Sequence, residues 1–307
     1  MKKNNQKDKL LICVDLDGTL LSKSSTNEIH EETIKWVKEA SNQGHHVCIL
    51  TGRPWRSTKT IYQRLGLNTI VGNQNGAQIH NPSDQNFVPT IHYLNLNEML
   101  YIIGDEKIQK EMTNLAIEGL GWVQIQKRDP VLESIFGFKD AEKFVVGIDL
   151  NKIPLKPTGI VFDVKETTDP VELQSFMTKK YGDLGEFSYW SKGKESTSVF
   201  DITSLGVNKG KVVPLLRRYY DIPWENTVSI GDSFNDVPMF KKTNISVTVK
   251  NADPEIKSWS TVRWNKTNEE GGVGLYLKKL LENPELEIEK SLEVHRKNRI
   301  KRKENGN

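Results

Sequence analysis

The chain has 307 residues, of which 36% are hydrophobic and 27% are charged, and its net charge is +3. This length accommodates one large domain or, as we expect here, two. No apolar run approaches the roughly 20 residues that a membrane-spanning helix needs, so the composition argues against an integral membrane protein of the helical class.

The two ends of the chain are basic, and the part between them is not. Segment 1–9 is followed by an apolar run that is too short for a secretory signal peptide, so we expect the protein to stay in the cytoplasm. Cys13 and Cys48 both lie in apolar runs, which is typical of small core residues in a reducing compartment. Six basic residues fall in segment 296–303, which leaves the rest of the chain mildly acidic.

The first predicted element is a buried strand over residues 10–14, where five apolar residues follow one another. A strand that is apolar on both faces is typical of a parallel sheet covered by helices. Asp15 and Asp17 follow it, and residues two apart in an extended chain point the same way. Gly18 lets the backbone turn away there. Two converging carboxylates imply a cation, and oxygen ligands suit Mg²⁺. The alternative is a surface turn whose aspartates cap a helix.

Residues 15–19, Asp-Leu-Asp-Gly-Thr, resemble the first signature of the haloacid dehalogenase superfamily, whose phosphatases use an aspartate nucleophile. The resemblance implies that Asp15 is the nucleophile. The superfamily's dehalogenases lack the second acid. A carboxylate at Asp17 is therefore the phosphatase and phosphomutase version, in which this residue serves as general acid and base.

A helix over 33–40 and a strand over 45–50 come next, and Thr51-Gly52-Arg53-Pro54 ends that strand. A hydroxyl and exposed amides between a strand and a helix form a phosphate-binding corner. The tetrapeptide resembles the superfamily's second motif. This implies that Thr51 and Gly52 bind the transferring phosphoryl group, with Arg53 as a nearby support.

A helix over 58–65 and a short strand over 68–72 precede Asn75-Gly76-Ala77, which is similar to a turn of the phosphatases called Cof-type. Asn75-Gly76 is also a common hairpin turn. We leave two interpretations of Asn75 open, a purely structural turn and a contact with substrate at the rim of the site.

Residues 90–205 contain no motif. Alternating runs at 143–150 and 159–164 and helical patterns at 106–120 and 171–181 predict an inserted α+β domain. Asp149 and Asp163 also follow apolar runs, but neither has a second acid two places on, so we predict no catalytic role for them. The resemblance implies that this insert is a large, type IIB-like cap that covers the active site, excludes water and selects the substrate.

A strand over 200–203 leads to residues 206–211, which open a helix. Lys209, in its first turn, lies at the positive end of the helix dipole, which is unfavourable unless an anion is near. The alternative is a solvated lysine. The superfamily's third motif is a lysine before glycine, which implies that Lys209 binds the phosphoryl group.

A buried strand over 227–230 ends in Gly231-Asp232-Ser233-Phe234-Asn235-Asp236, and two acids four apart suit a metal-binding loop. The hexapeptide resembles the superfamily's fourth motif, Gly-Asp-x-x-Asn-Asp. We expect residues 244–249 to form the last core strand and residues 270–274 to lead the final core helix.

The segment beyond Pro284 is charged and helical in pattern. We expect a solvated or disordered tail. The alternative is attraction to RNA or another polyanion, but no aromatic residue interleaves the basic run, which argues against nucleic acid.

The sequence thus predicts a doubly wound, Rossmann-like parallel α/β core over 1–89 and 206–283, a cap over 90–205 and a basic tail over 284–307. The resemblance implies Mg²⁺-dependent hydrolysis of small phosphomonoesters, such as sugar phosphates or phosphorylated cofactors, through an aspartyl-phosphate. The implied metal ligands are the carboxylates of Asp15 and Asp232 and the backbone carbonyl of Asp17, with Asp236 acting through water or from behind the ligands.

Asn235 would join Thr51 and Lys209 on the phosphoryl oxygens. Two alternatives remain, a sugar phosphomutase on the same core and a non-catalytic protein that binds polyanions through the tail. The phosphomutase would release no inorganic phosphate and would need a bisphosphate primer. The sequence carries no signature of the individual substrate or of the oligomeric state.

Overall fold

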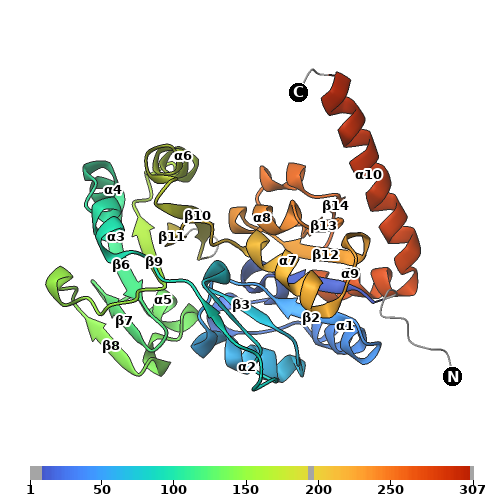
Figure 1. Ribbon diagram of the computed structural model, residues 1–307, viewed down its shortest axis with the longest axis horizontal. Helices are drawn as coiled ribbons and strands as arrows, with labels where there is room; N and C mark the ends of the chain where they lie inside the picture. Colours follow the sequence, from blue (N-terminus) through green and yellow to red (C-terminus); the bar gives the residue numbers. More distant parts are fainter. Residues whose placement is uncertain (1–8, 193–196, 305–307) are drawn as a thin grey trace.

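The computed structural model describes residues 9–192 and 197–304, without the side chains of 301–304. The basic segment 1–8 and the side chains of the last three basic residues, Lys301, Arg302 and Lys303, lie outside the described residues. Figure 1 shows two units side by side, one built on the N-terminal and C-terminal parts of the chain and the other on its middle part. No helix in the described ranges is long and apolar enough to cross a membrane.

The first unit contains a five-stranded parallel sheet in the order β14-β13-β12-β1-β2. Its strands are β1 (Leu11–Val14), β2 (His46–Ile49), β12 (Thr227–Gly231), β13 (Ile245–Thr248) and β14 (Val262–Arg263). Its helices are α1 (Glu31–Asn42), α2 (Trp55–Leu65), α7 (Lys209–Tyr220), α8 (Val237–Phe240) and α9 (Gly272–Glu282). The predicted parallel sheet is confirmed, but β13 is not its last strand, because β14 extends the edge.

The second unit contains a six-stranded, mainly antiparallel sheet in the order β10-β11-β9-β6-β7-β8. Its strands are β6 (Met112–Glu118), β7 (Trp122–Ile125), β8 (Lys143–Val146), β9 (Gly159–Val164), β10 (Gly185–Ser191) and β11 (Ser198–Ser204). Its helices are α3 (Leu96–Ile103), α4 (Glu106–Glu111), α5 (Pro130–Ile135) and α6 (Pro170–Tyr181). A three-stranded sheet contains β3 (Val71–Asn73), β4 (Gln78–His80) and β5 (Thr90–Ile91). In the chain it follows α2 of the first unit and precedes α3 of the second.

The predicted helix over 106–120 is wrong in its second half. The helix α4 ends at Glu111, and the chain continues as β6, which lies between β9 and β7. Residues 114–118 are buried on both faces of this central strand, so the strand has no polar and apolar alternation that would distinguish it from a helix.

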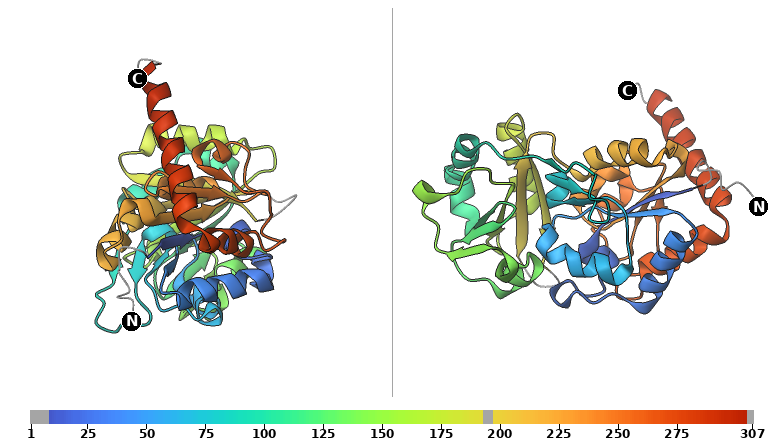
Figure 2. Two further views of the ribbon diagram at one scale, coloured as in Figure 1. Left: turned by 90° about the vertical axis from the view of Figure 1, so that its right-hand side faces the viewer. Right: turned by 60° about the horizontal axis from the view of Figure 1, so that its bottom comes forward.

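The C-terminal segment forms the helix α10 (Pro284–Glu304), as its pattern predicts, and of the two expected forms, solvated or disordered, its outer residues 296–300 are ordered and exposed. The side chain of Ser291 is buried, and its hydroxyl donates to the carbonyl of Asn244 over 2.8 Å. His295 contacts the same carbonyl. The first part of α10 therefore docks on the core, while its last turns stand away from the body of the molecule (Figure 2).

His45, the residue before β2, should make the stability of the fold depend on pH. The Nδ1 atom of half-buried His45 accepts a hydrogen bond from the backbone N–H of Leu10 over 3.0 Å. Burial, together with the charges of Lys9 and His46, lowers the pKa of His45 to about 4. Between pH 6.5 and 4, His45 is therefore protonated in the unfolded chain but neutral in the folded one. The free energy of unfolding consequently falls as the pH falls.

We expect His45→Gln to lose stability less steeply over this range than the unchanged protein, as measured by urea unfolding at several pH values. The matched control is His92→Gln, at an exposed position, which should leave the pH slope unchanged. Equal slopes for the His45 variant and the unchanged protein would contradict the prediction.

Candidate active site

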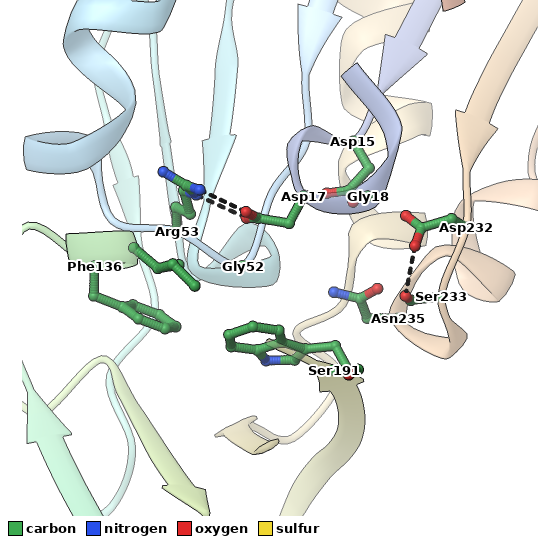
Figure 3. A pocket seen from close by; sticks show the side chains of 12 residues that line it. Asp15, Asp17, Gly18, Gly52, Arg53, Phe136, Ser191, Asp232, Ser233 and Asn235 are labelled. Atoms are coloured by element: carbon green, nitrogen blue, oxygen red, sulfur yellow. Dashed lines mark hydrogen bonds and ion pairs between the residues drawn. The ribbon is translucent and has the colours of Figure 1, made fainter. Parts of the chain in front are cut away.

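The motif residues meet at the carboxyl edge of the parallel sheet (Figure 3). Asp15 follows β1, Asp232 follows β12, and Lys209 opens α7 beside them. Parallel strands place their carboxyl ends at one edge, which brings together residues far apart in the chain. The fold therefore gathers at one place the four motifs that the sequence singles out.

Three carboxylates form a cluster at this edge, in which Asp15 and Asp236 are buried and Asp232 is partly exposed. Asp15, Asp232 and Asp236 each offer an oxygen atom, and these atoms lie within 4.8 Å of one another. The Nζ atom of Lys209 donates to Oδ1 of Asp15 over 2.6 Å and to Oδ1 of Asp236 over 2.7 Å. Both Lys209 and Asp236 are fully buried. One lysine thus faces three acids, which leaves a net negative charge on the cluster.

The pKa values in the cluster reflect this imbalance. Burial raises the pKa of Asp15 well above its ordinary value, Lys209 opposes the rise, and the neighbouring acids add to it. Burial and then Asp236 raise the pKa of Asp232 to about 7. Burial alone would lower the pKa of Lys209, but Asp15 and Asp236 raise it. The lysine therefore stays charged.

The donor set fits a hard divalent cation, because all three cluster residues offer oxygen and carry uncompensated negative charge. Asp232 is oriented by the hydroxyl groups of Thr19 and Ser233, over 2.6 and 3.1 Å. Asp236 accepts at Oδ2 from the backbone N–H groups of Asp232 and Ser233, over 2.9 and 3.0 Å. Both oxygens of Asp236 are therefore already engaged, which suits a supporting position behind the ligands.

Gly18 is required at its position by both conformation and space. Its φ of +70° lies in the left-handed region, which favours glycine. A Cβ atom there would collide with the carboxylate of Asp232. A side chain at position 18 would thus displace one of the three cluster acids.

Asp17 turns away from the cluster toward Arg53 (Figure 3). The two side chains form a double hydrogen bond, Nε to Oδ2 over 2.7 Å and Nη2 to Oδ1 over 2.5 Å. Buried Arg53 also donates to Oδ1 of Asn27 and to the carbonyl of Ser24. Burial would raise the pKa of Asp17, but Arg53 outweighs it and lowers that pKa below its ordinary value. Sequence reasoning gave Arg53 a supporting role near phosphate, and the structure places its guanidinium on Asp17.

The predicted phosphate-binding residues surround the cluster. The Oγ1 atom of buried Thr51 accepts from the backbone N–H of Arg53 over 3.1 Å. The Nδ2 atom of Asn235 donates to Oδ1 of Asn75 over 3.2 Å. Asn75 is itself buried, and its backbone N–H donates to the carbonyl of Thr51 over 2.9 Å. Asn75 is therefore buried and contacts another motif residue.

A cavity of about 50 Å³ opens over these groups. The core lines it with motif residues, and the second unit adds Ile135, Phe136, Trp190 and Ser191. The rings of Phe136 and Trp190 pack 5.9 Å apart and form one continuous wall. Sequence reasoning missed the lining role of these four residues, and only the packing of the second unit on the core reveals it.

A buried ion pair joins the two units beside this wall. Arg56, on α2, pairs through Nη2 with Oε2 of Glu118, on β6. Its Nε atom donates to the carbonyl of Phe136 over 2.9 Å. Both charged side chains are less than a tenth exposed. Arg56 thus holds part of the cavity wall in place from the core side.

Comparison with known proteins agrees with this geometry. A family model described as haloacid dehalogenase-like hydrolase matches residues 12–277. A putative phosphatase of Metamycoplasma hominis is 56% identical over 275 residues, which cover 90% of this chain and 98% of that protein. A Bacillus subtilis protein named 5-amino-6-(5-phospho-D-ribitylamino)uracil phosphatase is 29% identical over 268 residues, or 87% of this chain and 96% of that protein.

Solved structures share the fold. A haloacid dehalogenase-like hydrolase from B. subtilis superimposes with a TM-score of 0.71 at 22% identity and covers 88% of this chain and 99% of its own. A sugar phosphatase of subclass IIB of the same superfamily has a TM-score of 0.69 at 19% identity, with 89% of this chain and 99% of its own covered. The two-unit architecture is therefore that of a known fold with a cap.

Proposed function

The chain belongs to the haloacid dehalogenase-like hydrolases, as a Cof-type phosphatase with a cap, and we propose that it uses Mg²⁺ and an aspartyl-phosphate intermediate. It is a phosphoric monoester hydrolase that acts on small phosphorylated substrates. We further propose sugar phosphates or phosphorylated cofactors as those substrates, which the names of the relatives support. The observation that carries the proposal is the cluster of three acids beside buried Lys209.

Asp15 and Asp17 would divide the chemistry between them. Asp15 attacks the phosphorus in line, its oxygen forms the new P–O bond, and the bond to the alcohol oxygen breaks. Asp17 gives its proton to that departing oxygen and later takes a proton from the water that hydrolyses the aspartyl-phosphate. Because Arg53 holds Asp17 ionised, Asp17 has to take up a proton on substrate binding before it can act as an acid.

The other motif residues would stabilise charge on the phosphoryl group. Thr51, Gly52, Lys209 and Asn235 would donate to its oxygens, where preorganised donors contribute most to catalysis. Mg²⁺ would be held by the carboxylates of Asp15 and Asp232 and the carbonyl of Asp17, with Asp236 behind them, and would neutralise charge at the site. We propose the boundaries 1–89 and 206–283 for the core, 90–205 for the cap and 284–307 for the tail.

The test is phosphate release from a panel of small phosphomonoesters, with Mg²⁺ and with EDTA. We expect release that EDTA abolishes and added Mg²⁺ restores. Mg²⁺ should also raise the melting temperature of the unchanged protein, because it binds only the folded state, and should do so much less for Asp232→Asn. Release that is insensitive to EDTA would overturn the metal assignment. Phosphoryl transfer only with a bisphosphate primer, and no release, would identify a phosphomutase instead.

A further inference from the structure

The cap places one buried carboxylate against the phosphate-binding corner of the core. Asp201 lies on β11, in register between Ser188 of β10 and Val161 of β9, and it is 4% exposed. A Cβ atom on Gly52 would lie 3.8 Å from Oδ2 of Asp201. Within the described residues this oxygen has no hydrogen-bond partner. The carboxylate thus faces the corner that Thr51 and Gly52 form.

We propose that Asp201 is a positioning residue, which contacts Asn75 from the cap side and thereby sets the amide of Asn235 for the phosphoryl group. The inference rests on the proposed function, in which Asn235 binds that group. We call the chain of contacts from Asp201 through Asn75 to Asn235 the relay. Asn75 is its middle member, between the cap carboxylate and the fourth motif.

Asn75 is placed to connect Asp201 with Asn235. Its Oδ1 atom accepts from Nδ2 of Asn235 over 3.2 Å, and the same Oδ1 lies 3.6 Å from the position of a Cβ on Gly52. The amide nitrogen of Asn75 lies 3.7 Å from that same position, and Oδ2 of Asp201 lies 3.8 Å from it, so the carboxylate is the acceptor that we assign to this amide. The second hydrogen on Nδ2 of Asn235 is then available to a phosphoryl oxygen.

The backbone around Asn75 is held under strain. Gln74, Asn75 and Gly76 have φ values of 49°, 54° and 102°, all in the left-handed region. Such a run persists only where its surroundings determine it, and it is typical of functional sites. Asn73 provides part of that support, since its Nδ2 donates to the carbonyl of Arg53 over 2.9 Å. Asp201 would support the same backbone segment from the cap side.

The charges around Asp201 also fit a contact with Asn75 across the boundary between cap and core. Burial, and then Glu118, raise the pKa of Asp201 to about 7, while Lys209 and hydrogen bonds from Asn75 and Trp190 oppose the rise. A buried carboxylate without its own counter-ion costs stability, and such costs gather at functional sites. Because Asp201 belongs to the cap and Asn75 to the core, this contact depends on how the cap packs on the core.

The experiment measures the dissociation constant of inorganic phosphate by calorimetry in the presence of Mg²⁺, which requires no turnover. We expect Asp201→Ala and Asn75→Ala each to weaken phosphate binding about tenfold, as the loss of a hydrogen bond that orients a charged ligand does. The double variant should bind no more weakly than either single one. Asp201→Asn should stay within about threefold of the unchanged protein, because its amide oxygen still accepts from Asn75.

The matched control is Asp105→Ala. Asp105 is also a buried cap aspartate, but it pairs with Lys180 and Tyr181. Its loss should lower the melting temperature and leave phosphate affinity unchanged. Equal effects of Asp201→Ala and Asp105→Ala on affinity, or effects of Asp201→Ala and Asn75→Ala that multiply, would overturn the inference. If Asp201→Ala does not fold, Asn75→Ala and Asp201→Asn still decide it. Absence of phosphate release by the unchanged protein would instead refute the proposed function.

Discussion

Asp15→Asn should reduce kcat at least about a thousandfold, because the amide cannot attack phosphorus and no aspartyl-phosphate can form. The fold should survive the change. The amide oxygen can still accept from Lys209, and one of the three mutually repelling acids of the cluster becomes neutral. The measurement is phosphate release under saturating substrate, beside a thermal melt of the same preparation.

Asp149→Asn is the matched control for this variant. Asp149 also follows an apolar run, but it is half exposed and pairs with Lys152 in the cap. It should keep full activity. An Asp15→Asn protein that retained more than a trace of turnover would refute the assignment of the nucleophile, even if every other prediction held.

Lys209→Met should abolish activity and also destabilise the protein in EDTA by about 3–5 kcal/mol, the usual cost of leaving a buried charge without its partner. Asp15 and Asp236 both lose their counter-charge in this variant. Mg²⁺ should restore part of the lost stability, because a divalent ion brings positive charge back to the same cluster. Urea unfolding with Mg²⁺ and with EDTA measures both effects.

Lys211→Met tests whether the effect belongs to the site. Lys211 lies two residues further along α7 and is exposed. Its loss should change stability by less than about 0.5 kcal/mol, as surface substitutions do. If the two methionine variants unfold at the same urea concentration, Lys209 is not the counter-charge of the cluster.

The core could be predicted from the sequence because its signals are local. Asp15, Lys209 and Asp232 each follow a buried strand or open a helix, and a parallel sheet then brings such positions to one edge. The ion pair of Asp17 with Arg53 could not be predicted in the same way. It depends on Asn27 and on the carbonyl of Ser24, in a loop that carries no pattern of its own.

The cap was predicted as an α+β unit, but its details were not. Segment 112–118 is a strand because β9 and β7 flank it on both sides, and no local period records those neighbours. Phe136 and Trp190 reach the cavity only through the packing of the cap on the core. The C-terminal helix is positioned by Ser291 and His295, two contacts that a charge pattern does not report.

The ion pair between Arg56 and Glu118 fixes how the cap is aligned on the core. A buried ion pair loses about as much hydration energy as it gains in attraction. The pair therefore selects one alignment of the cap on the core and adds little to the free energy that holds them together. Arg56 also donates to the carbonyl of Phe136, so the same pair sets where the cavity wall lies relative to the core.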